Sequence, residues 1–232
     1  MRHTFPLMLF AAGFGTRMRP LTDARPKPLI NVGGITLLDH ALGAARGAGV
    51  SRIVINVHYL GEQIEAHLHD SDIALSWERD TILDTGGGLK AALPLLGAGP
   101  VLTLNTDAVW TGANPLAQLM GAWDHDKMDV LFLLLPAKQA RSATGRSDFT
   151  MDAGGRVTWA KGAEGYLYLG AQIIAPDLLE TDTQPVFSLH GPWTRAMQAG
   201  RAYGIVHQGD WCDVGHPEGI AEAEGMLRVA DV

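Results

Sequence analysis

A glycine-containing loop near the start of the chain holds the residues best suited to chemistry. The segment from Leu9 to Thr22 reads LFAAGFGTRMRPLT, and PKP follows at positions 26–28. Backbone N–H groups in a Gly-x-Gly sequence can approach phosphate oxygens closely, because glycine has no side chain and adopts positive φ angles. The loop therefore predicts a phosphate-binding site, although an ordinary tight turn has the same pattern.

Positive charge is concentrated in the same loop. Four cations lie within eleven residues: Arg17, Arg19, Arg25 and Lys27. Arginine presents a planar fork of donors and lysine a point charge, and both bind phosphate well. The alternative interpretation is a solvated basic loop, since lysine and arginine are common on protein surfaces.

Two common nucleotide-binding fingerprints do not fit this loop. The dinucleotide pattern G-x-G-x-x-G requires a third glycine where Met18 stands, and an acid near positions 56–58, which read NVH. The P-loop pattern GxxxxGK[ST] does not occur in the sequence. The sequence therefore supports neither hydride transfer on NAD nor a P-loop nucleotidase.

Acidic and glycine-rich elements further along the chain offer more chemistry. Asp107 follows the apolar run VLTLN, and Asp213 lies in the segment WCDVG. A carboxylate pair can hold Mg²⁺, although each aspartate taken singly also fits a cap or a turn. Asp84 begins the segment DTGGGL, whose glycines leave N–H groups free and suit a base or ribose packed against the backbone. A flexible loop before a helix is the alternative there.

The elements that must position these residues alternate between strands and helices as far as residue 135. Apolar runs predict strands at 7–11, 52–57, 73–77, 100–105 and 130–135. Apolar stripes and start signals predict helices at 36–48, 61–68, 88–96 and 115–123. This alternation is typical of a parallel sheet with helices on both faces, in which ligands bind at the carboxyl ends of strands.

The second half of the chain has a different pattern. Strands are predicted at 147–151, 156–159, 166–174 and 202–206, with helices at 194–198 and 217–229. The sequence has no repeat and no linker rich in proline, glycine or serine. We therefore expect residues 1–232 to form a single domain in which the second half extends the sheet of the first.

Composition limits the possible partners and compartments. The 18 Lys and Arg against 25 Asp and Glu give a formal charge of −7, which argues against nucleic acid or an anionic membrane as the main partner. No apolar run reaches the roughly 18 residues of a membrane helix, and the first residues lack a signal-peptide pattern. The single cysteine, Cys212, excludes an internal disulfide framework. A cytoplasmic protein is expected.

The motifs together resemble one enzyme family. The segment FAAGFGTRMRPLTDARPKPL at positions 10–29 resembles the signature L-A-A-G-x-G-T-R-M-x-P-L-T-x-x-x-P-K-P-L of nucleotidyltransferases that activate sugar 1-phosphates. The segments NTD at 105–107 and WCDVGHPE at 211–218 resemble two further elements of that family, with Thr106 and His216 as departures. The DTGGG segment and the chain length resemble the branch of bacterial N-acetylmuramate-1-phosphate uridylyltransferases, with Asp84 in place of glutamate.

The resemblance implies an α/β protein with a Rossmann-like three-layer nucleotidyltransferase fold and a mixed, mostly parallel central sheet. It implies transfer of UMP from UTP to a sugar 1-phosphate, N-acetylmuramate 1-phosphate being favoured, with release of pyrophosphate and a role in peptidoglycan recycling. Mannose-1-phosphate guanylyltransferase, another sugar-1-phosphate nucleotidyltransferase or a non-catalytic nucleotide-binding regulatory subunit remain alternatives. A monomer or small homo-oligomer is expected. The glycines at 86–88 and the turn from Gly162 to Gly165 are expected to leave room for the lactyl and acetamido groups of the sugar, if both border it.

The resemblance also assigns roles to individual residues. Arg17 and Lys27 would act on the phosphates, and Asp107 and Asp213 would bind Mg²⁺. The residues expected to bind the nucleotide are Ala11, Ala12, Gly13, Gly15, Thr16, Gly86 and Gly87. Those expected to bind the sugar substrate are Asp84, Gly88, Asn105 and Lys161.

Overall fold

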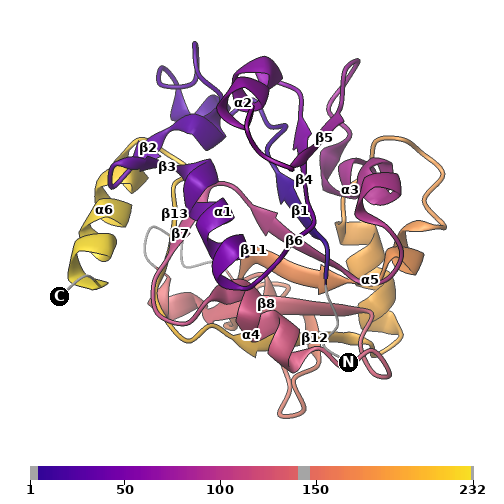
Figure 1. Ribbon diagram of the computed structural model, residues 1–232. Coiled ribbons are helices and arrows are strands. Elements are labelled where there is room, and N and C mark those ends of the chain that lie inside the picture. Colours follow the sequence, from indigo (N-terminus) through magenta and orange to yellow (C-terminus); the bar gives the residue numbers. More distant parts are fainter. Residues whose placement is uncertain (1–4, 141–146, 231–232) are drawn as a thin grey trace.

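A nine-stranded mixed sheet forms the centre of the part of the chain that the computed structural model describes, residues 5–140 and 147–230 (Figure 1). Its first half is parallel and follows the order β5, β4, β1, β6. The bounds of these strands are β1 Leu7–Phe10, β4 Ile53–Val57, β5 Ala74–Trp77 and β6 Val101–Asn105. Every residue of β4 is buried, as expected for a strand covered on both faces.

The second half of the chain extends this sheet beyond β6. Strand β11 (Tyr166–Ile174) pairs antiparallel with β6 on one side and with β8 (Val130–Pro136) on the other. Strand β12 (Ala202–Val206) is parallel to β8, and the hairpin of β9 (Phe149–Met151) and β10 (Val157–Trp159) joins β11. Only β10 and β11 of the nine described strands run against the rest, which confirms the mixed, mostly parallel sheet.

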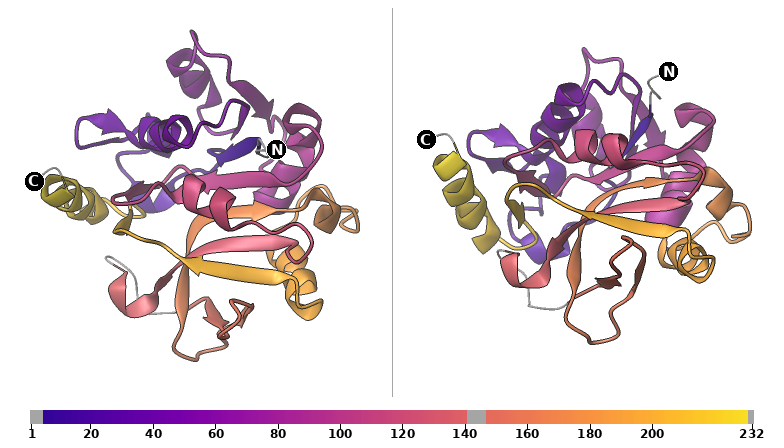
Figure 2. Two further views of the ribbon diagram at one scale, coloured as in Figure 1. Left: turned by 60° about the horizontal axis from the view of Figure 1, so that its bottom comes forward. Right: turned by 90° about the horizontal axis from the view of Figure 1, so that it is seen from below.

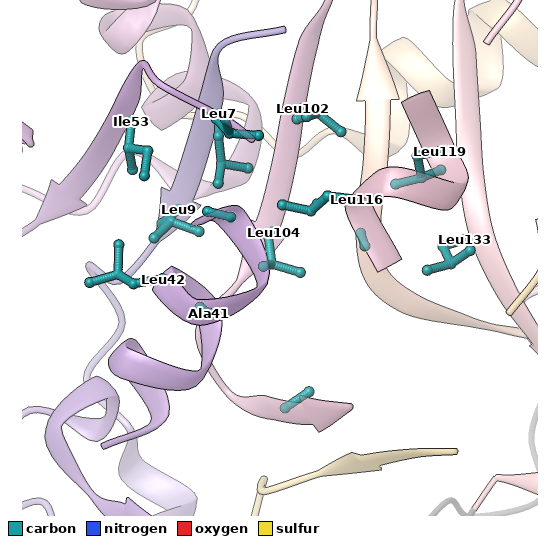
Figure 3. Close-up of a cluster of buried hydrophobic side chains, with 14 of the residues drawn as sticks. Leu7, Leu9, Ala41, Leu42, Ile53, Leu102, Leu104, Leu116, Leu119 and Leu133 are labelled. Carbon is teal, nitrogen blue, oxygen red and sulfur yellow. The ribbon is translucent and has the colours of Figure 1, made fainter. Parts of the chain in front are cut away.

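Two helix layers cover the sheet. Helices α1 (Leu37–Gly47), α2 (Gly61–His67) and α4 (Pro115–Ala122) pack on one face, where leucine, isoleucine and alanine side chains form the larger core cluster (Figure 3). Helices α3 (Asp84–Leu96) and α5 (His190–Gln198) pack on the other face with a second cluster. The side chain of Thr36 caps α1 by accepting a hydrogen bond from Asp39 N at 3.0 Å.

A third unit stands at the side of the sheet. Helix α6 (Glu218–Ala230) lies beside the short strands β2 (Asn31–Val32) and β3 (Ile35–Thr36), apart from the helices that cover the sheet (Figure 2). A two-stranded ribbon of β7 (Ala108–Trp110) and β13 (Trp211–Asp213) packs against it. Among the described residues, no helix combines the length and the apolar character that crossing a membrane requires.

Helix boundaries differ from the sequence-based expectation at two places. Helix α3 begins at Asp84 instead of Gly88, and α5 begins at His190 instead of Thr194. Glycine has low helix propensity, so the triple glycine was expected to precede the helix. Tertiary packing overrides that preference, because Gly86 N and Gly87 N both donate to the carbonyl oxygen of Phe187.

Candidate active site

A cleft of about 280 Å³ opens at the carboxyl ends of β1, β4 and β6. Its lining comes from the loop after β1, from the start of α3 and from the segment after β6. The lining residues are Phe10, Ala11, Ala12, Gly13, Gly15, Lys27, Pro28, Asn56, Ile82, Asp84, Thr85, Asn105, Thr106 and Asp107. Eight of the residues expected from the sequence therefore share one cleft: Ala11, Ala12, Gly13, Gly15, Lys27, Asp84, Asn105 and Asp107.

The loop after β1 presents unused backbone donors. Within the described ranges, the N–H groups from Gly13 to Thr16 meet no hydrogen-bond acceptor, and these residues are exposed or half-buried. Gly15 adopts φ 62°, and a Cβ atom there would lie 2.9 Å from Cγ2 of Thr22. Thr22 Oγ1 donates to Gly15 O at 2.9 Å and holds the loop in this shape. Such a row of free N–H groups can bind the oxygens of an anion.

An ion pair lies beside this loop, since a Cβ atom on Gly15 would be 3.0 Å from Lys27 Cβ. Lys27 Nζ is 2.9 Å from Asp107 Oδ2, and the two side chains are 12% and 30% exposed. Lys27 begins a 3-10 turn between two prolines, which fixes its backbone. Asp107 lies two residues after the last residue of β6. The pair places one positive and one negative charge at the point where β1 and β6 end.

The ribbon of β7 and β13 brings Asp213 to Asp107. Asp213 pairs with Ala108 in the antiparallel register, and Val214 N donates to Asp107 O at 2.8 Å. Burial and, after it, the charge of Asp107 raise the pKa of the Asp213 carboxyl above its ordinary value. Lys27, Arg17 and His216 oppose this rise. Two neighbouring carboxylates, one of them costly to ionise alone, are a donor set that fits a hard divalent cation.

Arg17 is exposed and does not line the cleft, but it lies beside this acidic pair. A Cβ atom on Gly215 would be 2.6 Å from Asp213 Oδ2 and 3.3 Å from an Arg17 guanidinium nitrogen. Gly215 therefore leaves space in which the guanidinium approaches the carboxylate. Thr16, the residue before Arg17, is exposed at the rim of the same loop.

The glycines at the start of α3 do not present the free N–H groups that the sequence predicted. Gly86 N and Gly87 N donate to Phe187 O at 2.9 and 3.0 Å, so the expectation of free N–H groups is wrong at both positions. All three glycines from Gly86 to Gly88 are buried and lie outside the cleft lining. Asp84 and Thr85, just before them, do line it. Because these glycines have no side chains, the start of α3 packs closely against residues 185–187 and against Glu78.

The expected sugar-binding residues are only partly assembled. Asn105 ends β6, lines the cleft and packs against Gly170. Lys161 is exposed in the turn between β10 and β11 and is not among the lining residues. Neither 86–88 nor 162–165 borders the cleft, so the expected room for the sugar substituents does not come from these glycines.

Sequence reasoning did not assign three polar lining residues to the site: Thr85, Thr106 and, most informative of them, Asn56. It is 4% exposed near the end of β4, and its Oδ1 accepts a hydrogen bond from Ala11 N at 2.8 Å. The available signal was an amide inside the otherwise apolar run RIVINV.

A separate acidic group lies away from the cleft. Ligand atoms of Asp124, His125 and Asp126 are within 4.8 Å of one another, on half-buried or exposed side chains. These residues precede β8, at the opposite end of the strands from the cleft. They form a polar segment after α4 and are not among the residues that line the cleft.

The fold and the cleft define a nucleotidyltransferase. A family model described as "MobA-like NTP transferase domain" matches residues 7–202. The chain belongs to this family.

Comparison with individual proteins shows which members of the family are similar to this chain. The chain is 38% identical to an N-acetylmuramate alpha-1-phosphate uridylyltransferase of Caulobacter vibrioides, with 96% of this chain and 97% of the relative covered. It is 35% identical to a protein of the same name from Neisseria meningitidis, with 94% and 96% covered. The crystal structure of HddC from Yersinia pseudotuberculosis has a TM-score of 0.78 at 20% identity, covering 96% of this chain and 99% of that one, which shows the shared fold.

Proposed function

We propose that this enzyme transfers UMP from UTP to N-acetylmuramate 1-phosphate and releases pyrophosphate. Two relatives covered over nearly their full length carry that activity in their names, which supports the substrate pair. The observation that carries the reaction type is the convergence of free loop N–H groups, the Lys27–Asp107 pair and Asp213 at one edge of the sheet. Because UTP is a cytoplasmic metabolite, we place the enzyme in the cytoplasm, in the recycling of peptidoglycan sugars.

The reaction needs positioning and charge neutralisation more than proton transfer. An oxygen of the sugar phosphate attacks the α-phosphorus of UTP in line, a new P–O bond forms, and the bond to pyrophosphate breaks. The attacking oxygen is already an anion at neutral pH, so a general base is unnecessary. The barrier arises from repulsion between two polyanions, which fixed donors and cations reduce.

Each group in the cleft has a role in that neutralisation. The N–H groups from Gly13 to Thr16 bind triphosphate oxygens, and the Arg17 fork holds the leaving pyrophosphate. Lys27 contacts the α-phosphate or the incoming sugar phosphate. For this, its ammonium group moves from Asp107 Oδ2 toward a phosphate oxygen.

Asp107 and Asp213 would hold Mg²⁺. When bound, the ion neutralises charge on both reacting phosphates. Without it, the two carboxylates repel each other and the incoming phosphates, so their placement beside the phosphate loop favours a metal-dependent site. Ala11, Ala12 and Asp84 are assigned to the nucleoside side of the cleft and Asn105 to the sugar side, while a role for Lys161 remains a prediction.

The same cleft also suits other nucleotide and sugar pairs, such as GTP with mannose 1-phosphate. A non-catalytic regulatory subunit would be expected to have lost its metal acids or its loop cations. This chain retains Arg17, Lys27, Asp107 and Asp213. We propose that residues 1–232 act as one catalytic domain, as a monomer or small homo-oligomer.

A pyrophosphate-release screen tests the reaction type. The four nucleoside triphosphates are each combined with a panel of sugar 1-phosphates in the presence of Mg²⁺, and products are identified by phosphorus NMR. We expect pyrophosphate and a nucleotide sugar in equal amounts, only when both substrates are present. Phosphate release without a sugar 1-phosphate, or no reaction with any substrate pair, would contradict the proposal.

A further inference from the structure

A buried carboxylate lies directly behind the nucleotide cleft. Glu78 follows β5 and is 3% exposed. In the part of the chain that the structure describes, no lysine or arginine forms an ion pair with it. Its charge is satisfied by two N–H donors instead: Asn56 Nδ2 donates to Oε1 at 2.7 Å, and Leu83 N donates to Oε2 at 2.7 Å. A buried charge is tolerated only when it is compensated in this way.

The two donors come from two separate segments of the chain that border the cleft. Asn56 lines the cleft, and its Oδ1 accepts the N–H of Ala11 at 2.8 Å, the first residue of the phosphate loop. Leu83 lies between Ile82 and Asp84, which also line the cleft. Glu78 thus links the end of β1, the end of β4 and the start of α3 through one carboxylate.

The orientation of the Asn56 amide depends on Glu78. The N–H of Ala11 needs an oxygen acceptor, and the Glu78 carboxylate needs a donor. Asn56 satisfies both with Oδ1 toward Ala11 and Nδ2 toward Glu78. A reversed amide would place donor against donor and acceptor against acceptor, so the carboxylate holds the amide in one orientation.

The space around the Glu78 carboxylate depends on a glycine in α3. A Cβ atom on Gly88 would lie 2.6 Å from Glu78 Oε1 and 3.0 Å from Asn56 Nδ2. Glycine at 88 therefore keeps open the space in which the two side chains meet. The carboxylate also lies at the N-terminus of the 13-residue helix α3, whose positive end favours a negative charge.

We propose that Glu78 is a positioning residue for the nucleotide: it fixes the Asn56 amide and the Ala11 N–H, and so preforms the nucleotide side of the cleft. Glu78 does not line the cleft and acts through Asn56. This inference rests on the proposed function, in which that cleft binds UTP. Its consequence is that a loss of Glu78 weakens UTP binding selectively and leaves the sugar phosphate side intact.

The variant Glu78→Gln tests this role. Glutamine has one acceptor and one donor group, so it cannot accept from both Asn56 Nδ2 and Leu83 N, and one buried N–H loses its partner. We expect KM for UTP to rise about tenfold, the order expected for a lost buried hydrogen bond, while kcat and KM for the sugar phosphate change less than about threefold. A purely structural role would lower the melting temperature and the folded fraction with both KM values unchanged, and would overturn the proposal.

A second substitution makes the test independent of simple destabilisation. Asn56→Asp alone sets two carboxylates against each other at the 2.7 Å contact. In the double variant Asn56→Asp with Glu78→Gln, the aspartate accepts from both Ala11 N and the glutamine amide, and the glutamine oxygen accepts from Leu83 N. We expect KM for UTP of the double variant to fall below that of either single variant. A value as high as the worse single variant would overturn the linked arrangement.

The control is Glu65→Gln, on the exposed side of α2, which makes the same chemical change away from the cleft. It should keep the KM values of the wild type. If the wild type itself neither binds nor consumes UTP, the proposed function fails. If the wild type turns over UTP and Glu78→Gln has an unchanged KM for UTP, only the inference about Glu78 fails.

Discussion

Charged side chains of opposite sign lie together at the cleft, where they compensate one another. Lys27 compensates one oxygen of Asp107, whereas the half-buried Asp213 beside it is costly to ionise, because partial burial raises its pKa. Arg17 approaches the same pair from the exposed loop. In the proposed reaction, a polyphosphate and its cation would replace the contacts that these groups make with one another. The proposed ligand therefore carries both signs of charge.

Removing either acid should abolish turnover without unfolding the protein. We expect Asp107→Asn and Asp213→Asn each to cost about 3 kcal/mol or more in transition-state stabilisation, because the metal loses a charged ligand. Steady-state kinetics at saturating Mg²⁺ measure this loss. The exposed Asp80→Asn is the matched control. Activity within threefold of the wild type in either acid variant would refute the metal assignment.

Asp213→Asn also has an expected effect on stability. The pKa of Asp213 is raised in the folded state, so its contribution to stability is complete below the unfolded pKa near 3.8 and is lost as pH rises through the folded pKa. Asparagine cannot ionise and avoids that loss. At neutral pH and without metal, the variant should melt no lower than the wild type. A clear fall in its melting temperature would show that ionised Asp213 stabilises the fold.

Arg17 should not tolerate a conservative exchange. Lysine keeps the charge but lacks the planar fork that binds two phosphate oxygens at once. We expect Arg17→Lys to lower kcat/KM for the nucleotide by about tenfold, the scale of a lost charge-assisted hydrogen bond, with little change in melting temperature. Arg25→Lys, on the same exposed loop, serves as the control. Unchanged kinetics in Arg17→Lys would indicate an ordinary solvated side chain.

At the scale of elements, the short ribbon of β7 and β13 is decisive because it joins residues 106 positions apart. It carries Asp213 and directly follows Asp107. The ribbon rests on a buried histidine: His207 is 4% exposed and hydrogen-bonds through Nδ1 to Gln118 Nε2 at 2.8 Å. Its ring meets Trp110 edge-on with centroids 5.2 Å apart. The support of the ribbon is thus sensitive to the protonation of one side chain.

Lowering the pH should reduce the stability that neutral His207 gives to the protein. Burial lowers the pKa of His207 in the folded state below its ordinary value of 6.5. The stability that neutral His207 contributes is therefore present above pH 6.5 and is lost as pH falls through the folded pKa. His207→Asn keeps an acceptor near Nδ1 and cannot be protonated in this range. We expect its melting temperature to fall less than that of the wild type between pH 7 and pH 5, with the 73%-exposed His69 changed to Asn as the control. Parallel curves would contradict the prediction.

The elements that the sequence predicted well are those with local signals. The apolar runs at 52–57 and 166–174 became β4 and β11, since burial on both faces requires such runs. The start of α3 was misplaced because its packing against residues 185–187 has no local trace. The ribbon strands β7 and β13 are three residues each and exist only through pairing with one another.

The site residues also divide into those that have a local sequence signal and those that do not. Gly13, Gly15 and Lys27 belong to one motif, and their placement in the cleft could be expected from the sequence. Gly86 and Gly87 were misinterpreted because their N–H groups are taken by a distant carbonyl. Glu78 had no motif at all, since its importance arises from contacts with Asn56 and Leu83 that only folding creates.

At the scale of the whole molecule, the chain returns on itself to complete one site. The loop of residues 11–16 follows the first strand, Asp107 lies just after β6, and Asp213 ends β13, shortly before the last helix. The sheet continues without interruption from the first half into the second through β11. The lining of the cleft comes from residues between 10 and 107, and the second half of the chain brings Asp213 beside Asp107, so the substrate pair must be tested on the intact chain.

A direct competition between substrate pairs tests the central claim most sharply. Catalytic efficiency is measured for UTP with N-acetylmuramate 1-phosphate and for GTP with mannose 1-phosphate, on the same preparation with Mg²⁺. We predict that the first pair is preferred by at least about tenfold in kcat/KM, or about 1.4 kcal/mol. A preference for GTP with mannose 1-phosphate would contradict the proposed substrate.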